Sequence, residues 1–151
     1  MVCLGNICRS PLAEGILRSK CDTLIVDSAG TASYHVGEPP DHRAINVARK
    51  NGIDISNLRA RQFSINDFEE FDFIFAMDTN NYKDIINLTK SNEHKKKVFL
   101  ILDTLKQSNQ NVPDPYYGGD EGFNKVFNLL KKALLVSISE YPSKKYLPKL
   151  K

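Results

Sequence analysis

Short apolar runs alternate with amphipathic stretches along the chain, a pattern typical of a parallel sheet flanked by helices. The apolar runs predict buried strands at residues 23–26, 71–77 and 98–102. Apolar side chains at helical spacing predict helices at residues 10–21, 43–50, 79–88 and roughly 120–140. For the first helix we expect the Ser10 hydroxyl to be the cap and Pro11 to be the first helical residue.

One segment breaks this pattern. Residues 103–119 contain Pro113, Pro115, Gly118 and Gly119, so we expect an irregular loop there. A loop of this length in a compact domain is usually functional.

Composition narrows the class of protein. The 151 residues contain no internal repeat or low-complexity linker, so we expect a single domain over residues 1–151. No apolar run reaches the roughly 20 residues that cross a membrane, so we expect no membrane span. The net charge of +3 is too small to predict nucleic-acid binding. The lysines are expected to be solvated charge where they cluster, at residues 95–97 and at Lys144, Lys145, Lys149 and Lys151.

The cysteines and histidines point away from disulfide and metal chemistry. Three cysteines are too few for a disulfide framework, which favours a reducing cytoplasm as the location. The three histidines show no spacing of a metal site, and we expect neither a metal nor a cofactor.

The segment Cys3-Leu4-Gly5-Asn6-Ile7-Cys8-Arg9-Ser10-Pro11 carries the chemistry. Backbone N–H groups of a tight loop that opens a helix favour an anion, and Gly5 and Asn6 tolerate the positive φ that such a loop requires. Arg9 adds a planar fork of donors that fits two oxygens of a phosphate. The same positive surroundings favour the thiolate of Cys3, which predicts a covalent phosphotransfer site.

Residues 3–11 resemble the signature loop of the low-molecular-weight protein tyrosine phosphatases. Further segments resemble that family in the family's order: residues 27–31, 36–41, 59–62, 71–74, 77–78 and 114–118. The resemblance implies a three-layer α/β domain with a four-stranded parallel sheet and helices on both faces. It also implies hydrolysis of phosphotyrosine, in a protein or a small phosphomonoester, through a phosphocysteine and without a metal. We expect a monomer or a weak dimer.

Carried over residue by residue, the resemblance makes Cys3 the nucleophile, Arg9 the phosphate clamp and Asp114 the general acid. Asp114 lies in the long loop, where one carboxyl can serve as acid and then as base. The predicted substrate-binding residues belong to the loop and to three tyrosines that could form aromatic walls: Leu4, Gly5, Asn6, Ile7, Cys8, Ser10, Tyr34, Tyr116 and Tyr117.

This sequence departs from the family pattern at two places, before the nucleophile and at Leu58. Only Met1 and Val2 precede the nucleophile, where the family has a longer apolar strand, so we expect a truncated start or a frail domain. Many relatives carry a histidine at the position of Leu58, so we expect Asn6 to be held less firmly here. We further expect that peroxide can join Cys3 and Cys8 in a reversible disulfide.

Three other kinds of protein share features with this sequence: a protein arginine phosphatase, an arsenate reductase and a phosphate-binding module. A protein arginine phosphatase typically has threonine where this chain has Ile7, and the bulkier side chain favours the phosphotyrosine class. An arsenate reductase needs a resolving cysteine pair, and residues 75–95 contain no cysteine. A phosphate-binding module with weak or no turnover stays open because of the short first strand.

Overall fold

A four-stranded parallel sheet lies at the centre of the computed structural model, which describes residues 1–140. The strand order is β2-β1-β3-β4, and the strands are β1 (Val2–Cys3), β2 (Ala29–Gly30), β3 (Ile74–Ala76) and β4 (Val98–Leu100). Val2 pairs with Ala29 on one side and with Ala76 on the other, so β1 is a central strand. The expected α/β class and parallel sheet are therefore confirmed.

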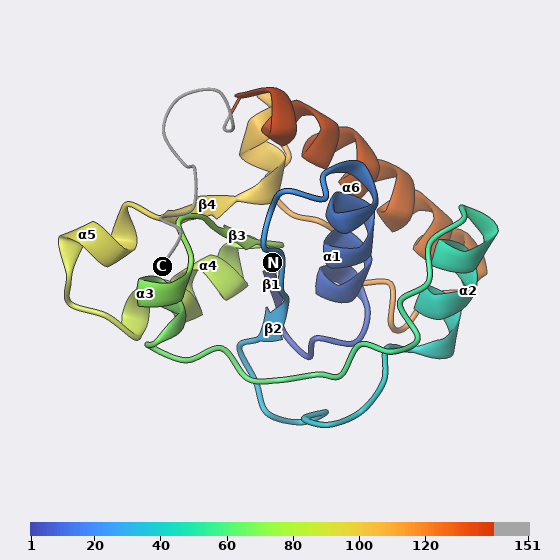
Figure 1. Cartoon of the computed structure of the whole chain (residues 1–151), viewed down its shortest axis with the longest axis horizontal. Coiled ribbons are helices and arrows are strands. Elements are labelled where there is room, and N and C mark those ends of the chain that lie inside the picture. Colours follow the sequence, from blue (N-terminus) through green and yellow to red (C-terminus); the bar gives the residue numbers. More distant parts are fainter. Residues whose placement is uncertain (141–151) are drawn as a thin grey trace.

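Helices cover both faces of this sheet. They are α1 (Arg9–Lys20), α2 (His42–Lys50), α3 (Asp67–Glu70), α4 (Thr79–Asn87), α5 (Asn92–Lys95), the 3₁₀ helix η1 (Ile101–Leu105) and α6 (Asp120–Glu140). Figure 1 shows α1, α2 and α6 on one side of the sheet and α3, α4 and α5 on the other. The three-layer arrangement expected from the resemblance is present.

Each layer boundary has its own apolar core. On the side of α1 and α6, Leu12, Phe123 and Leu130 are buried with one another. On the opposite side, Phe68 and Ile85 pack against the sheet. The burial of these side chains is the main stabilising term in a fold of this kind.

The strand expected at residues 23–26 is wrong. These residues form no strand; the second strand is Ala29–Gly30, where the sequence suggested a turn. Leu24 and Ile25 are exposed, and Ile25 has 82% of its surface open to solvent. The β-branched residues favoured a strand locally, but pairing with β1 selects the two residues that lie beside Val2 and Cys3.

The expected start of the first helix is also wrong. The helix begins at Arg9, and the preceding Cys8 makes no side-chain cap hydrogen bond. Ser10 lies inside the first turn, and its hydroxyl contacts the loop that follows β1. In α2 and α4 a side chain does cap the helix, from Asp41 and Asp78. The short helices α3 and α5 were not predicted.

Some expectations lie outside the described residues. The lysine-rich end, from Lys144 to Lys151, belongs to this group, and the single domain over residues 1–151 stays a prediction for the same reason. Of the helices within residues 1–140, none combines the length and apolarity needed to cross a bilayer.

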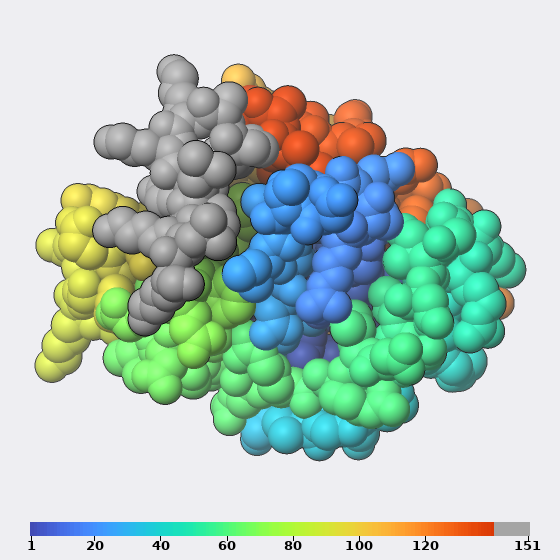
Figure 2. All heavy atoms as spheres, viewed as in Figure 1, coloured from blue at the N-terminus to red at the C-terminus, as the bar shows by residue number. Residues whose placement is uncertain are grey.

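The fold brings chain segments together at one edge of the sheet. Parallel strands place their carboxyl ends at the same edge, so the loop after β1 and Asp78 after β3 meet there. Figure 2 shows one face of the molecule, on which little of the chain's beginning reaches the surface. Its darkest blue atoms lie at the bottom of a recess between α1 and the green segment that follows α2.

Gly30 allows β2 to lie directly against the loop after β1. A Cβ atom at Gly30 would lie 2.7 Å from the Leu4 carbonyl oxygen and 3.1 Å from the Gly5 carbonyl carbon, both backbone atoms. We expect Gly30→Ala to lower the free energy of unfolding by about 1–3 kcal/mol, because β2 must move away from the loop. Urea unfolding measures this change. Gly119→Ala is the matched control, since nothing lies within 4 Å of a Cβ there, and an equal effect of both substitutions would contradict the prediction.

Candidate active site

The loop after β1 folds around the sulfur of Cys3. Asn6 has a φ of 56°, in the left-handed region that asparagine tolerates, and this turns the chain back toward the strand. The prediction of positive φ is confirmed for Asn6 but is wrong for Gly5, which is not among the residues with positive φ. A Cβ atom at Gly5 would lie 3.0 Å from the His35 ring, so a larger residue there would require this ring to shift.

Two hydrogen-bonding groups of this loop face the Cys3 sulfur. The backbone N–H of Asn6 donates to Cys3 Sγ at 3.3 Å, and Ser10 Oγ lies 3.0 Å from the same sulfur. Cys3 is buried, with 3% of its surface exposed. The fold thus brings a backbone N–H donor and a hydroxyl group to a buried sulfur.

The Asn6 side chain holds the loop in this shape. Its Nδ2 donates to Ser10 Oγ at 2.8 Å and to Ser28 Oγ at 2.9 Å, and its Oδ1 accepts from the Arg61 backbone N–H at 3.0 Å. All hydrogen-bonding groups of the amide are therefore engaged. Leu58 packs against the apolar core, and the expectation that Asn6 is held less firmly than beside a histidine stays a prediction.

Behind Asn6 lies a buried carboxyl group. Ser28 Oγ donates to Glu14 Oε2 at 2.5 Å, and Glu14 Oε1 lies 2.7 Å from Nη2 of Arg18, one turn further along α1. Glu14 is 2% exposed, and this burial raises its pKa; the Ser28 and Arg18 contacts act in the opposite direction. Hydrogen bonds thus connect Glu14 through Ser28 and Asn6 to the Ser10 hydroxyl, which lies beside the Cys3 sulfur.

The Arg9 guanidinium is held by hydrogen bonds at its Nη1 end. Its Nη1 donates to Asp78 Oδ2 at 2.7 Å and to the Val112 carbonyl at 3.0 Å. Its Nη2 lies 3.7 Å from Asp114 Oδ2. Within the described residues, all hydrogen bonds of the guanidinium are made through Nη1. The Nε and Nη2 donors remain to bind two oxygens of a phosphate side by side.

The structure therefore brings Arg9 and Asp114 together although they lie in different segments. Asp114 is held on the loop by the Tyr116 backbone N–H, which donates to its Oδ1 at 3.1 Å, and its side chain is 41% exposed. A half-exposed carboxyl beside Arg9 can exchange protons with water and with a leaving group.

The three predicted wall tyrosines lie on loops and are exposed. Tyr116 and Tyr117 follow Asp114 and contact each other edge to face, with ring centroids 5.0 Å apart. Tyr117 is 93% exposed and Tyr34 is 75% exposed, so neither ring serves the core. Contact of these rings with a substrate stays a prediction.

Cys8 differs from Cys3 although both lie in the loop. Burial raises the pKa of the Cys8 thiol, and the carboxylate of Asp41 adds to this effect. Cys8 therefore stays protonated at neutral pH, and a protonated thiol is a poor nucleophile. All three cysteines are free thiols, and the Cys3–Cys8 disulfide stays a prediction.

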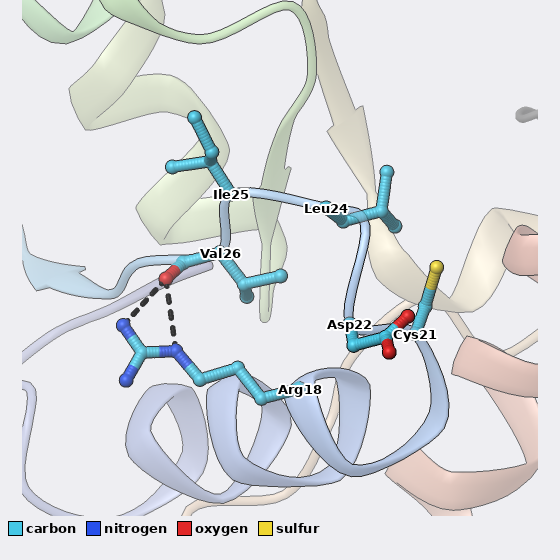
Figure 3. A pocket seen from close by; sticks show the side chains of 6 residues that line it. All are labelled: Arg18, Cys21, Asp22, Leu24, Ile25 and Val26. Atoms are coloured by element: carbon cyan, nitrogen blue, oxygen red, sulfur yellow. Dashed lines mark hydrogen bonds between the residues drawn. The ribbon is translucent and has the colours of Figure 1, made fainter.

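Two hollows lie near α1. One, of about 400 Å³, lies beside the loop and is lined by Leu4, Arg9, the start of α4 and residues 111–114. The other, of about 340 Å³, lies at the far end of α1, where Arg18 donates two hydrogen bonds to the Val26 carbonyl (Figure 3). Only the first contains residues of the proposed chemistry. No group of three or more His, Cys, Asp or Glu side chains within residues 1–140 is arranged to hold a metal ion.

Sequence reasoning missed several residues of this site. Asp78 was not among the predicted site residues, yet it caps α4 and also holds Arg9. Its place directly after a buried strand, at the carboxyl edge of the sheet, was the available signal. Glu14, Ser28 and Arg43 carried no local signal, because their roles depend on contacts between distant segments.

Comparison with known proteins agrees with this geometry. A sequence model of the family described as "Low molecular weight phosphotyrosine protein phosphatase" matches residues 1–140. The chain is 46% identical to a Synechocystis protein classed by its name among the low molecular weight protein-tyrosine-phosphatases, over 92% of this chain and 94% of that protein. It is 42% identical to the low molecular weight phosphotyrosine protein phosphatase of Schizosaccharomyces pombe, over 83% and 85% of the two chains.

Solved structures give the same result. The fold is similar to that of a protein tyrosine phosphatase from Entamoeba histolytica in a product state mimic, with a TM-score of 0.87 and 36% sequence identity. The match covers 97% of this chain and 96% of that chain.

The buried carboxyl of Glu14 leads to a pH-dependent stability. Because its pKa is raised in the folded protein, the folded state keeps the proton to a higher pH than the unfolded chain. The free energy of unfolding therefore decreases as the pH rises from the ordinary glutamate value of about 4.3 through the raised pKa. Glu14→Gln should remove this decrease while keeping an acceptor for Ser28. Urea unfolding of both proteins across this range measures the difference, and parallel curves would contradict the assignment.

Proposed function

Because this chain belongs to the low molecular weight phosphotyrosine protein phosphatase family, we propose that it hydrolyses phosphotyrosine through a phosphocysteine formed on Cys3. One observation supports this assignment most strongly. The buried sulfur of Cys3 accepts a backbone hydrogen bond at the centre of a loop that leads into Arg9, whose Nε and Nη2 make no hydrogen bond within the described residues.

The first step transfers the phosphoryl group to the protein. Cys3 Sγ attacks phosphorus in line, and the bond from phosphorus to the tyrosine oxygen breaks. Arg9 and the loop N–H groups bind the equatorial oxygens, whose charge they stabilise in the transition state. Asp78 keeps the guanidinium in place by holding Nη1. The protonated carboxyl of Asp114 gives its proton to the departing phenolate.

The second step regenerates the enzyme. Asp114, now ionised, accepts a proton from water, which attacks phosphorus and displaces Cys3 Sγ. The Ser10 hydroxyl, 3.0 Å from the sulfur, stabilises the departing thiolate. The sulfur thereby returns to the contacts with Asn6 and Ser10 that it had at the start.

The substrate class follows from the family and the residues around the loop. Phosphoproteins and phosphomonoesters are the substrates of this family, and we propose phosphotyrosine in proteins as the substrate here. Exposed rings at Tyr34, Tyr116 and Tyr117 are suited to contact an aromatic phosphoester. Ile7 is buried in the loop, and its bulk favours phosphotyrosine over phosphoarginine. The free thiols support a reducing compartment such as the cytoplasm.

A panel of phosphopeptides tests the reaction and its nucleophile. We expect release of phosphate from the phosphotyrosine peptide and little from the phosphoserine or phosphoarginine peptides, measured at equal concentrations. Cys3→Ser should reduce the rate to background, whereas Cys21→Ser, a distant thiol at the end of α1, should not change it. Release from phosphoarginine alone would indicate an arginine phosphatase, and binding of phosphate without release would indicate a binding module.

Asp114→Asn tests the general acid. We expect kcat for a phosphotyrosine peptide to fall by about 10²–10⁴-fold, because the phenolate then leaves without a proton. The dissociation constant of inorganic phosphate should change little by comparison, since Asp114 is not part of the phosphate-binding loop. Steady-state kinetics and phosphate titration measure the two quantities. An unchanged kcat would remove Asp114 from the mechanism.

A further inference from the structure

Arg43, in the first turn of α2, joins segments that lie far apart in the sequence. Its Nε and Nη2 donate to the two carboxylate oxygens of Asp41, at 3.0 and 2.9 Å. Its Nη1 donates to the Gly118 carbonyl at 2.9 Å, and its Nη2 donates to the Tyr116 carbonyl at 3.0 Å. One guanidinium thus connects the cap of α2 to the segment that follows Asp114.

Aromatic rings hold this guanidinium in position. Its central carbon lies 4.7 Å from the centroid of the Phe123 ring and 5.7 Å from that of Tyr116. Phe123 is a fully buried side chain of α6, so it is a rigid support. Contacts of a guanidinium with ring faces add to the attraction of the hydrogen bonds. The Arg43 guanidinium in turn holds the pKa of the Asp41 carboxyl below its usual range, which keeps the pair ionised.

The hydrogen bonds of Arg43 reach Tyr116, the residue whose N–H binds the Asp114 carboxylate. The Tyr116 N–H donates to Asp114 Oδ1, and the Tyr116 carbonyl accepts from Arg43, so this residue is tied on both sides. Asp114 itself is 41% exposed, and burial therefore does not fix its carboxyl. Its side chain contacts Arg9 Nη2 at 3.7 Å and the Tyr116 N–H at 3.1 Å, and the second contact depends on the backbone that Arg43 holds.

The other end of the connection reaches the phosphate-binding loop. The Asp41 backbone N–H donates to the Ile7 carbonyl at 2.8 Å. A continuous path therefore leads from Ile7 through Asp41 and Arg43 to Tyr116. This path fixes the distance between the loop that carries the nucleophile and the loop that carries the acid.

We propose that Arg43 is a positioning residue that sets the Asp114 carboxyl at the leaving group, a role that rests on the proposed function of Asp114. Loss of Arg43 leaves the phosphate-binding loop able to accept a phosphate but displaces the acid. A misplacement of about 1 Å can reduce a rate by about 100-fold. The rate is reduced for substrates whose leaving group needs a proton.

The test compares two aryl phosphates. Phenolate is a poor leaving group that needs the proton of Asp114, whereas 4-nitrophenolate leaves with little assistance. We expect Arg43→Met to lower kcat/KM for phenyl phosphate by about 10–100-fold and for 4-nitrophenyl phosphate by less than about 3-fold. Arg43→Lys keeps the charge but not the fork of donors, so the same contrast should appear at smaller size. It also serves where Arg43→Met fails to fold.

Two further variants separate the possible outcomes. Arg49→Met, an exposed arginine at the other end of α2, is the control and should change neither rate. Asp114→Asn should reproduce the selective loss. An equal loss on both substrates in the Arg43 variants, beside a selective loss in Asp114→Asn, would overturn the role of Arg43 alone. No selective loss in Asp114→Asn would overturn the general-acid role, and the role of Arg43 with it.

Discussion

The chemistry of this protein depends on how the loop after β1 closes around one sulfur atom. A loop that points its N–H groups at a single point is unfavourable unless the backbone conformation is fixed. Here the left-handed turn at Asn6 provides the reversal, and the three hydrogen bonds of the Asn6 side chain stabilise it. The sulfur of Cys3 then faces donors in a buried site, and the position of every other functional group is defined relative to it.

The surrounding fold supports this loop from several directions. Strand β2 lies against it without a side chain at Gly30, and α1 begins directly from it. Asp78, at the end of β3, holds Arg9, while Arg43 connects the loop region to the acid. Each support comes from a different element, which explains why a small sheet of short strands is sufficient to form the site.

The site residues that are contiguous in the chain could be predicted from the sequence, whereas those that distant segments contribute were missed. The loop chemistry is contained in residues 3–11, so Cys3 and Arg9 could be recognised from residue types and spacing. Asp114 needed the family resemblance, since an Asp-Pro pair in a loop is also ordinary turn chemistry. Ser10 was expected both to belong to the loop and to cap the first helix; only the cap is wrong, because its hydroxyl contacts Asn6 and Cys3 instead. The strand expected near Ile25 failed for a similar reason, because sheet pairing overrode local propensity.

The central claim is that Cys3 carries the phosphoryl group between the two steps. Rapid acid quenching during turnover of a phosphotyrosine peptide, followed by fragmentation mass spectrometry of the chain, tests it most directly. The account predicts a phosphorylated cysteine at position 3 and an unmodified Cys8. Phosphate on Cys8, or turnover at the full rate without any phosphorylated cysteine, would contradict it.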